Sequence, residues 1–347
     1  MLFIGVDVHL RKIVVHILDA NGKTVKSQTL TGDIGLFLES ILRLKEDCAV
    51  CYEASCGYGH LYDRLKRLPN VKRVVVAHAG QLRLIFRSKR KNDRADAKKL
   101  ATLLFLDQVP AVHVPGADVR AWRQMIEFRS KTVQKCTAIK NQLRGLLRTH
   151  GIAGLSRKAL WTRAGMVWLA TVELPGVTAA FQRDMLMDSL RQEQVRLKRV
   201  TALLDQTAQT QPGVQLLRTI PGVGPRTAEA VVAYIDNPDR FRRSKQVGSY
   251  FGLVPCQDQS ADANRLGHIT REGPSTVRRL LTEAAWQGIR RSPEIAAVFE
   301  RIQGGDPKRK KIALVATTHW LVRVMHAMLR SGEAARFTTR TKERAAA

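Results

Sequence analysis

Four acidic residues lie where a metal-dependent reaction on a phosphodiester would need them. Asp7 and Glu53 each lie at the end of an apolar, β-branched run that predicts a strand. Asp93 and Asp96 are three residues apart on a predicted helix, so both carboxylates lie on one helix face. Acids from two strand ends and one helix can converge and hold two divalent cations about 4 Å apart. Oxygen donors of this kind favour Mg²⁺ or Mn²⁺ over Zn²⁺.

Each of these acids also has an ordinary structural explanation. Asp93 can cap the helix that it precedes, and Asp96 can pair with Lys99. Taken together, in the order strand, strand and helix, the acids favour a ribonuclease-H-like site. Basic residues near the pair fit a nucleic-acid backbone brought to the metals. They are Arg83, Arg87, Lys89, Arg90, Lys91, Arg94, Lys98 and Lys99.

The composition independently indicates a polyanionic partner. The chain has 347 residues, 58 of them basic and 30 acidic, so its net charge is +28. Nucleic acid is the expected partner for such an excess, and an anionic membrane surface is the alternative. We see no apolar run of about 18 residues or more and therefore expect no membrane span. The N-terminus lacks the features of a signal peptide, so we expect a cytoplasmic protein.

The cysteines give little sign of a metal site or a disulfide framework. Their number is five, and Cys48 and Cys51 have the spacing of zinc and redox sites. They lie in a predicted strand, however, where residues three apart point to opposite faces. Buried thiols are therefore the favoured interpretation.

The pattern of elements predicts α/β structure followed by all-α structure, in three parts. Residues 1–112 alternate predicted strands and helices, which indicates a mixed sheet covered by helices. Residues 113–210 are helical, and leucines at 186, 190, 197 and 204 are spaced by four or seven. This spacing fits either a short coiled coil or an amphipathic helix packed within its own chain. Residues 211–347 are mainly helical.

The third part has two features of its own. Residues 220–225, Ile-Pro-Gly-Val-Gly-Pro, lie between two short predicted helices, as in a helix-hairpin-helix motif. Backbone N–H groups at the second helix can there meet a phosphate. The segment 257–273 is polar and without periodicity, and we expect a flexible loop. The basic run 308–311, with Lys308 and Lys310, is either a phosphate contact or a solvated face.

Six stretches of the sequence resemble a known family. They are F-I-G-V-D-V-H, C-Y-E-A-S-C-G-Y, K-N-D-R-A-D-A, T-I-P-G-V-G-P-R-T-A, F-G-L-V-P-C-Q-D-Q-S and G-H-I-T-R-E-G-P-S-T-V-R-R-L-L. In order and spacing they are similar to the DEDD transposases of the IS110 family, including its IS1111 subgroup. The resemblance implies an N-terminal RuvC-like domain whose metal-binding catalytic acids fall on Asp7, Glu53, Asp93 and Asp96. It also implies a C-terminal transposase domain with a nucleophilic serine, which falls on Ser260.

What the resemblance implies goes beyond the composition. Members of the family excise and insert their own mobile element by serine attack on DNA phosphodiesters, which forms a phosphoserine–DNA intermediate. Some are guided by a structured non-coding bridge RNA that pairs with donor and target DNA, and they act as tetramers. Ala261 follows Ser260 where members often have glycine. We expect phosphate contacts from Arg90, Lys91, Arg94, Arg265, Arg271, Lys308 and Lys310.

Two other functions stay open at this point. One is a metal-dependent, structure-selective nuclease that uses the acids for hydrolysis and needs no serine. The other is a non-catalytic, basic nucleic-acid-binding protein whose acids are structural.

Overall fold

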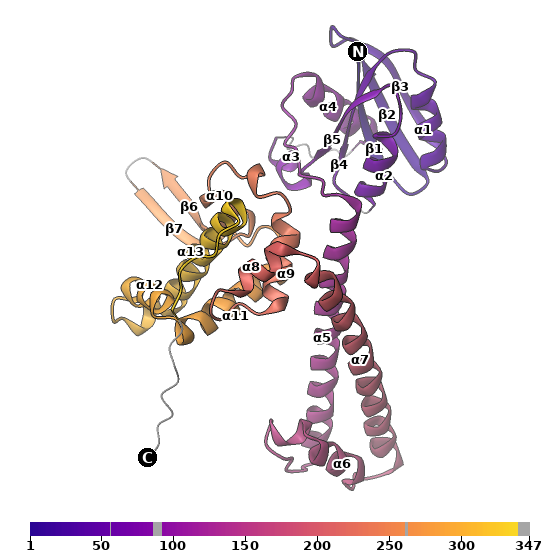
Figure 1. The fold of residues 1–347 in the computed structure, drawn as a ribbon. Coiled ribbons are helices and arrows are strands. Elements are labelled where there is room, and N and C mark those ends of the chain that lie inside the picture. The colour runs from indigo at the N-terminus through magenta and orange to yellow at the C-terminus, as the bar shows by residue number, and fades with distance from the viewer. Residues whose placement is uncertain (56, 86–91, 261–262, 339–347) are drawn as a thin grey trace. The chain divides into compact units, whose positions relative to one another are not determined.

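The computed structural model describes residues 1–55, 57–85, 92–260 and 263–338 (Figure 1). The chain divides into two compact units, Met1–Arg120 and Ala121–Ala347. Each unit has hydrophobic clusters of its own. The predicted subdivision into 1–112, 113–210 and 211–347 stays a prediction.

The first unit contains a five-stranded mixed sheet in the order β3-β2-β1-β4-β5 (Figure 1). The strands are β1 (Leu2–Val8), β2 (Lys12–Leu18), β3 (Thr24–Thr31), β4 (Cys48–Glu53) and β5 (Val71–Ala77). β1, β2 and β3 pair antiparallel, whereas β4 pairs parallel with both β1 and β5. An Asn-Gly turn joins β2 to β3, with Gly22 at a φ of 76° and the Asp19 carboxylate accepting from Asn21 N. The prediction of a mixed α/β fold is confirmed for this part.

Helices cover both faces of this sheet. They are α1 (Ile34–Leu42), α2 (Tyr58–Leu65), α3 (Ala79–Ile85) and α4 (Asp93–Phe105). Side chains from α1 and α2 pack with Ile4 and Val6 of β1 on one face. On the other face, Leu100 and Leu104 of α4 pack with Cys51 of β4. Because successive strand residues point to opposite faces, β1 and β4 each present every second residue to α4.

A glycine brings β1 against α4. An ideal Cβ at Gly5 would lie 2.0 Å from the carbonyl oxygen of Ala97 and 2.3 Å from the amide nitrogen of Ala101. No side chain fits into that space, so glycine permits the close approach. Phe3, two residues earlier on the same face, packs edge-to-face on Phe105 of α4 at 5.3 Å between ring centroids. The central strand and α4 are thus held in one fixed arrangement.

Both cysteines of the C-x-x-C pair are buried in β4, on opposite faces. Cys48 belongs to the cluster with α1 and α2, and Cys51 to the cluster with α4. Burial raises the pKa of the Cys48 thiol to about 11 and that of Cys51 to about 12. The structure therefore gives the two residues the buried positions that the strand pattern predicts.

Two long helices lie side by side in the second unit (Figure 1). α5 (Ala117–Thr149) starts before the boundary at Arg120, and α7 is Val177–Gln209. Near one end of the pair, Arg129 Nε donates to Thr201 Oγ1 at 3.1 Å, and further along, Lys135 lies 3.9 Å from Glu193. These pairings show that the helices run antiparallel. Leu186 and Leu190 of the repeat pack in one cluster with Leu143 and Leu147 of α5, so this part of the repeat packs within its own chain.

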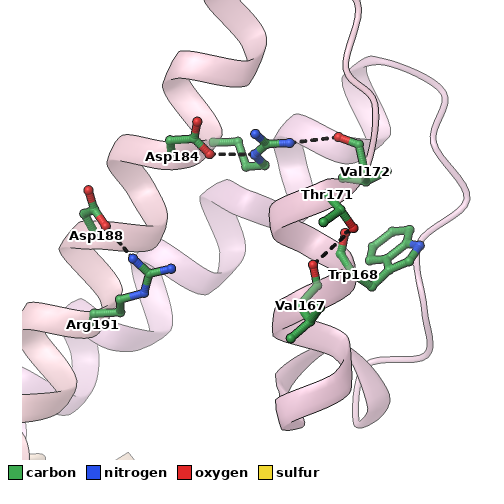
Figure 2. A network of polar contacts seen from close by, with 8 residues as sticks. Val167, Trp168, Thr171, Val172, Asp184, Asp188 and Arg191 are labelled. Atoms are coloured by element: carbon green, nitrogen blue, oxygen red, sulfur yellow. Dashed lines mark hydrogen bonds and ion pairs between the residues drawn. The ribbon is translucent and has the colours of Figure 1, made fainter.

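A shorter helix closes the far end of this pair. It is α6 (Arg163–Thr171), preceded by the 3₁₀ turn η1 (Ala159–Trp161). The buried Arg183 side chain of α7 donates to the Val172 carbonyl at the end of α6 at 2.8 Å, and to Asp184 at 2.8 Å. Figure 2 shows this network, together with the Asp188–Arg191 pair one turn further along α7. The hydrogen bond from Arg183 also lowers the pKa of Asp184.

The rest of the second unit is helical apart from one hairpin. Its helices are α8 (Pro212–Arg218), α9 (Pro225–Ile235), α10 (Lys245–Tyr250), α11 (Ser275–Arg291), α12 (Pro293–Gln303) and α13 (Lys310–Ser331), with 3₁₀ turns η2 (Pro238–Arg240) and η3 (Pro307–Arg309). The turn between α8 and α9 packs on α11. An added Cβ at Gly222, whose φ is 93°, would lie 2.4 Å from the Gly288 nitrogen. The glycine-rich turn is therefore required for packing as well as for its backbone conformation.

The expectation of an irregular loop at 257–273 is wrong. β6 (Pro255–Ser260) and β7 (Ala263–Ile269) form an antiparallel pair across most of that segment. Residues 255–259 and 265–268 are all exposed, so both faces of the hairpin lack a packing partner within the described chain. Polar residues on both faces removed the alternation that normally reveals a strand.

Helix α13 is long and apolar, although we expected no segment of the chain to be able to span a membrane. Residues Pro307–Ser331 are long and apolar enough to cross a membrane by length and composition, with a mean hydropathy of 1.4. In the structure, Leu321, Val322 and Met325 of α13 are fully buried in the largest core cluster. The core of this unit thus buries part of the apolar surface of α13, whereas Ile312 near its start is exposed.

Candidate active site

The register of the parallel strands places Asp7 and Glu53 next to each other. The last registered pair between β1 and β4 is Val6 with Tyr52, and the two acids directly follow it. Asp7 lies two residues after Gly5, and Glu53 two after Cys51, so both acids are on the sheet face that carries α4. The Glu53 carboxylate is exposed and has no hydrogen-bond or ion-pair partner in the described part of the chain. Two of the four predicted acids thus share one edge of the sheet.

The first turn of α4 supplies the other two acids. Asp93 and Asp96 are both in that turn and are only partly exposed. The cap of the helix is Asn92, whose side chain accepts from Arg94 N at 3.0 Å, so Asp93 is not needed as the cap. Asp96 does pair with Lys99, at 3.0 Å, as one alternative predicted.

Two residues that the sequence analysis did not single out complete the cluster. His9 Nε2 lies 3.1 Å from Asp7 Oδ2 and 3.5 Å from Asp93 Oδ2. Lys12 Nζ donates to Asp93 Oδ2 at 2.7 Å. The available signal was Asp-x-His at the end of a strand, because residues two apart share a face. A Lys three residues after the His lies opposite that His when a two-residue turn joins the two strands.

The electrostatics of Asp7 reflect this crowding. Burial raises the pKa of Asp7, and the negative charges of Asp93 and Asp96 raise it further, while His9 opposes the rise. The Asp7 carboxylate is therefore close enough to Asp93 and Asp96 for electrostatic repulsion between them. Like charges gathered in a half-buried place are costly unless a cation offsets them.

The donor set fits a hard divalent cation. Asp7, His9 and Asp93 each offer a ligand atom, and all three atoms lie within 4.8 Å of one another. Carboxylate oxygens dominate the set, as Mg²⁺ and Mn²⁺ prefer. Ammonium groups of Lys12 and Lys99 already contact two of the carboxylates, which shows that the acids attract cations. Asp7, His9 and Asp93 are therefore a candidate ligand set, with Asp96 on the same helix turn and Glu53 in register next to Asp7.

Ser260 lies in the second unit, separate in sequence from the acids. It is the last residue of β6 and pairs in register with Ala263, the first residue of β7. The intervening residues 261 and 262, including Ala261, lie outside the described part. The expected flexible loop is thus a hairpin whose last registered pair contains Ser260.

The predicted phosphate contacts are spread over several elements. Arg94 is exposed on α4 and Arg265 on β7, whereas Arg271 is exposed at a φ of 56° after β7. Lys308 is exposed in η3 and Lys310 is exposed at the start of α13, where Lys310 Nζ lies 5.1 Å from the ring centroid of Trp286. Arg90 and Lys91 lie outside the described residues.

Comparisons with known proteins place the chain among transposases. Residues 4–152 match the DEDD IS110 family model, described as "Transposase", and residues 214–300 match the model described as "Transposase IS116/IS110/IS902 family". A probable family 20 transposase of Pseudomonas aeruginosa is 28% identical over 291 residues, covering 83% of this chain and 84% of that protein. The transposase for insertion sequence element IS1111A of Coxiella burnetii is 25% identical over 284 residues, covering 81% and 76%.

The fold, the acid cluster and these matches define a DNA-processing enzyme of the transposase class. Two models of one family match at both ends of the chain, and full-length relatives cover most of it. The chain belongs to the IS110 family of transposases. Membership implies DNA as the substrate and a divalent cation as the cofactor.

Proposed function

We propose that this chain is a DNA recombinase that excises and inserts its mobile element by metal-assisted attack of Ser260 on DNA phosphodiesters. The observation that carries the proposal is the convergence of Asp7, Asp93 and Asp96 at one edge of the sheet, with Glu53 in register beside them. Such a cluster has little structural purpose in a chain of net charge +28, since basic residues are abundant everywhere else.

In this proposal the four acids are ligands of a divalent cation. Asp7, Glu53, Asp93 and Asp96 would hold Mg²⁺ or Mn²⁺ for the reaction at the scissile phosphate. The ion, when bound, supplies Lewis-acid polarisation of a phosphoryl oxygen and stabilises charge on the attacking and leaving oxygens. Exposed Arg94, close to the acids in sequence, is available to a neighbouring phosphate.

Ser260 provides the nucleophile in a balanced exchange. Its Oγ forms a bond to phosphorus, the bond from phosphorus to one DNA oxygen breaks, and that oxygen leaves as a hydroxyl after gaining a proton. The serine proton passes to a base, since a serine hydroxyl is weakly nucleophilic on its own. The phosphoserine–DNA linkage keeps the bond energy, so a second DNA hydroxyl can reverse the step and join a new strand without ATP. Family membership and the exposed hairpin support this role.

A substitution series tests the nucleophile. Ser260→Ala is expected to abolish strand exchange and the covalent protein–DNA adduct, detected as a labelled band that survives denaturing electrophoresis. Ser249→Ala, at an exposed position in α10, is the matched control and should retain both. Asp7→Asn should abolish every DNA cleavage while leaving DNA binding intact.

A metal-dependent nuclease is the second candidate, because the acid cluster is complete within the first unit. Cleavage that persists unchanged in Ser260→Ala, with no adduct in the parent protein, would favour hydrolysis. A parent protein that binds DNA but gives neither cleavage nor a covalent adduct, with binding unchanged in Asp7→Asn, would instead favour a non-catalytic binding protein.

We also propose, on the family resemblance, that a structured non-coding RNA guides the enzyme and that it works as a tetramer. RNA that co-purifies with the chain and maps beside its reading frame would support guidance. The mass of the assembly on DNA, measured by light scattering, tests the tetramer.

A further inference from the structure

Asp93 is held by a lysine from another strand. Lys12 Nζ donates to Asp93 Oδ2 at 2.7 Å, although 81 residues separate the two in sequence. The Lys12 side chain is 46% exposed and Asp93 is 28% exposed, so the pair lies at the rim of the cluster. By contrast, Lys99 reaches Asp96 along the same helix, three residues away. Only the first of these contacts depends on the tertiary fold.

The turn between β1 and β2 sets the position of Lys12. His9 N donates to the Lys12 carbonyl at 2.9 Å, which leaves Leu10 and Arg11 as a two-residue turn. Residues opposite each other in such a hairpin share a face. Lys12 therefore lies next to His9, on the face that carries Asp7 and the first turn of α4. The hairpin places a cationic group directly at the acid cluster.

The contact of Lys12 competes with the binding of a divalent cation to the same oxygen. Mg²⁺ approaches carboxylate oxygens to about 2.0–2.1 Å and carries twice the charge of an ammonium group. Asp93 Oδ2 already has Lys12 at 2.7 Å and His9 at 3.5 Å. An ion bound there repels the ammonium group and takes its acceptor. The flexible, half-exposed lysine side chain is then free to turn outward.

We propose that Lys12 exchanges partners: it neutralises Asp93 in the cation-free protein and moves to a phosphate of the nucleic acid when a divalent cation occupies the acids. This inference rests on the proposed metal-dependent function. It makes Lys12 a positioning residue that couples the two binding events. Because coupling between two ligands is reciprocal, DNA would tighten cation binding as much as the cation tightens DNA binding.

Cation affinity without DNA tests the first half of this exchange. Mn²⁺ is titrated into the full-length protein and free Mn²⁺ is followed by electron paramagnetic resonance. Lys12→Met should bind Mn²⁺ roughly 3–10-fold more tightly than the parent, since a competing cation is gone. Lys26→Met is the matched control, because Lys26 is exposed on β3 and has no acidic partner in the described chain. It removes the same charge from the same unit and should leave Mn²⁺ affinity unchanged.

DNA affinity tests the second half. The fluorescence anisotropy of a short labelled duplex is measured at fixed ionic strength with and without Mn²⁺. Mn²⁺ should strengthen duplex binding by the parent and by Lys26→Met. That gain should shrink several-fold in Lys12→Met, which no longer has the released ammonium group. An equal gain in all three proteins would overturn the transfer to phosphate.

The outcomes separate this inference from the proposed function. If Asp93→Asn binds Mn²⁺ as well as the parent, the metal site itself fails and both proposals fall. If Asp93 is needed for Mn²⁺ but Lys12→Met binds it no more tightly than Lys26→Met, only the exchange of Lys12 is overturned. Unfolding curves followed by circular dichroism show whether each variant is folded, and a misfolded Lys12→Met is replaced by Lys12→Gln with the same expectation.

Discussion

Glu229 is a buried acid outside the candidate active site. Its side chain is 1% exposed in α9 and lies 3.2 Å from Arg226, which also pairs with Asp205 of α7. Burial raises the pKa of Glu229 to about 7, and Arg226 and Arg129 oppose the rise. The folded protein therefore keeps a proton on Glu229 at pH values where the unfolded chain has lost it.

This difference predicts a pH-dependent stability. Between the ordinary pKa of 4.5 and about 7, the folded state binds more protons, so stability falls as pH rises through that window. The contribution is at most about 3 kcal/mol. Glu229→Gln should remove it, so thermal unfolding between about pH 5 and pH 8 should vary less than in the parent. Glu283→Gln, at an exposed acid paired with Arg279, is the control and should keep the parent profile. Parallel profiles for the parent and Glu229→Gln would contradict the prediction.

Several arginines have structural roles, which limits how many serve nucleic acid. Arg123 donates to the carbonyls of Ala233 and Tyr234 at the end of α9. Arg240 donates to the carbonyls of Ile235 and Tyr234. Positive groups at a helix C-terminus satisfy its last carbonyls and complement its dipole. Because these side chains form hydrogen bonds within the fold, the net charge overestimates the number of basic groups that can contact nucleic acid.

At the scale of elements, the packing of α4 on β1 positions the acid cluster. The helix carries Asp93 and Asp96, the strand carries Asp7, and Gly5 allows their close approach. Any separation of the two elements moves the carboxylates apart. The geometry of the site therefore depends on a residue that has no functional group.

Gly5→Ala tests this dependence. Its methyl group would overlap the α4 backbone, so we expect a loss of about 1–3 kcal/mol in stability and weaker Mn²⁺ binding. Calorimetric unfolding and Mn²⁺ titration measure the two effects. Gly145→Ala is the control, because an added Cβ there meets nothing within 4 Å on α5. That variant should gain up to about 1 kcal/mol and bind Mn²⁺ normally. Unchanged stability and Mn²⁺ affinity in Gly5→Ala would refute the role assigned to this contact.

The β6–β7 hairpin is the least supported element of the second unit. Isolated two-stranded hairpins are marginally stable in water, and this one is exposed on both faces. Its base is closed by a hydrogen bond from Thr270 N to the Val254 carbonyl at 2.9 Å. An element of this kind is suited to become ordered against a substrate, which is consistent with the role proposed for Ser260.

At the scale of the whole molecule, the net charge of +28 governs how the protein meets DNA. Contacts to phosphates release counterions, so affinity depends steeply on salt. With about 6–10 phosphate contacts, the affinity for a duplex should fall roughly 10³–10⁵-fold between 50 and 200 mM salt. Anisotropy titrations over a salt series measure this slope. A flat response would count against electrostatic DNA binding.

The sequence by itself determined the periodic elements and the residue types of the site. Apolar runs predicted β1, β2, β4 and β5, and helical spacing predicted α4, to within a few residues, because burial imposes a pattern on each element. The four acids and the family also followed from local stretches of sequence. A segment without that period, such as β6 and β7, was missed, since polar residues on both faces leave no signal.

Only the tertiary structure decided which residues are neighbours. Lys12 meets Asp93 because a two-residue turn and a strand register bring them together across 81 positions. Likewise, Glu229 acquires its raised pKa from burial among helices that are distant in sequence. Contacts of this kind depend on how elements pack, and the period of a single element contains no information about the element opposite it.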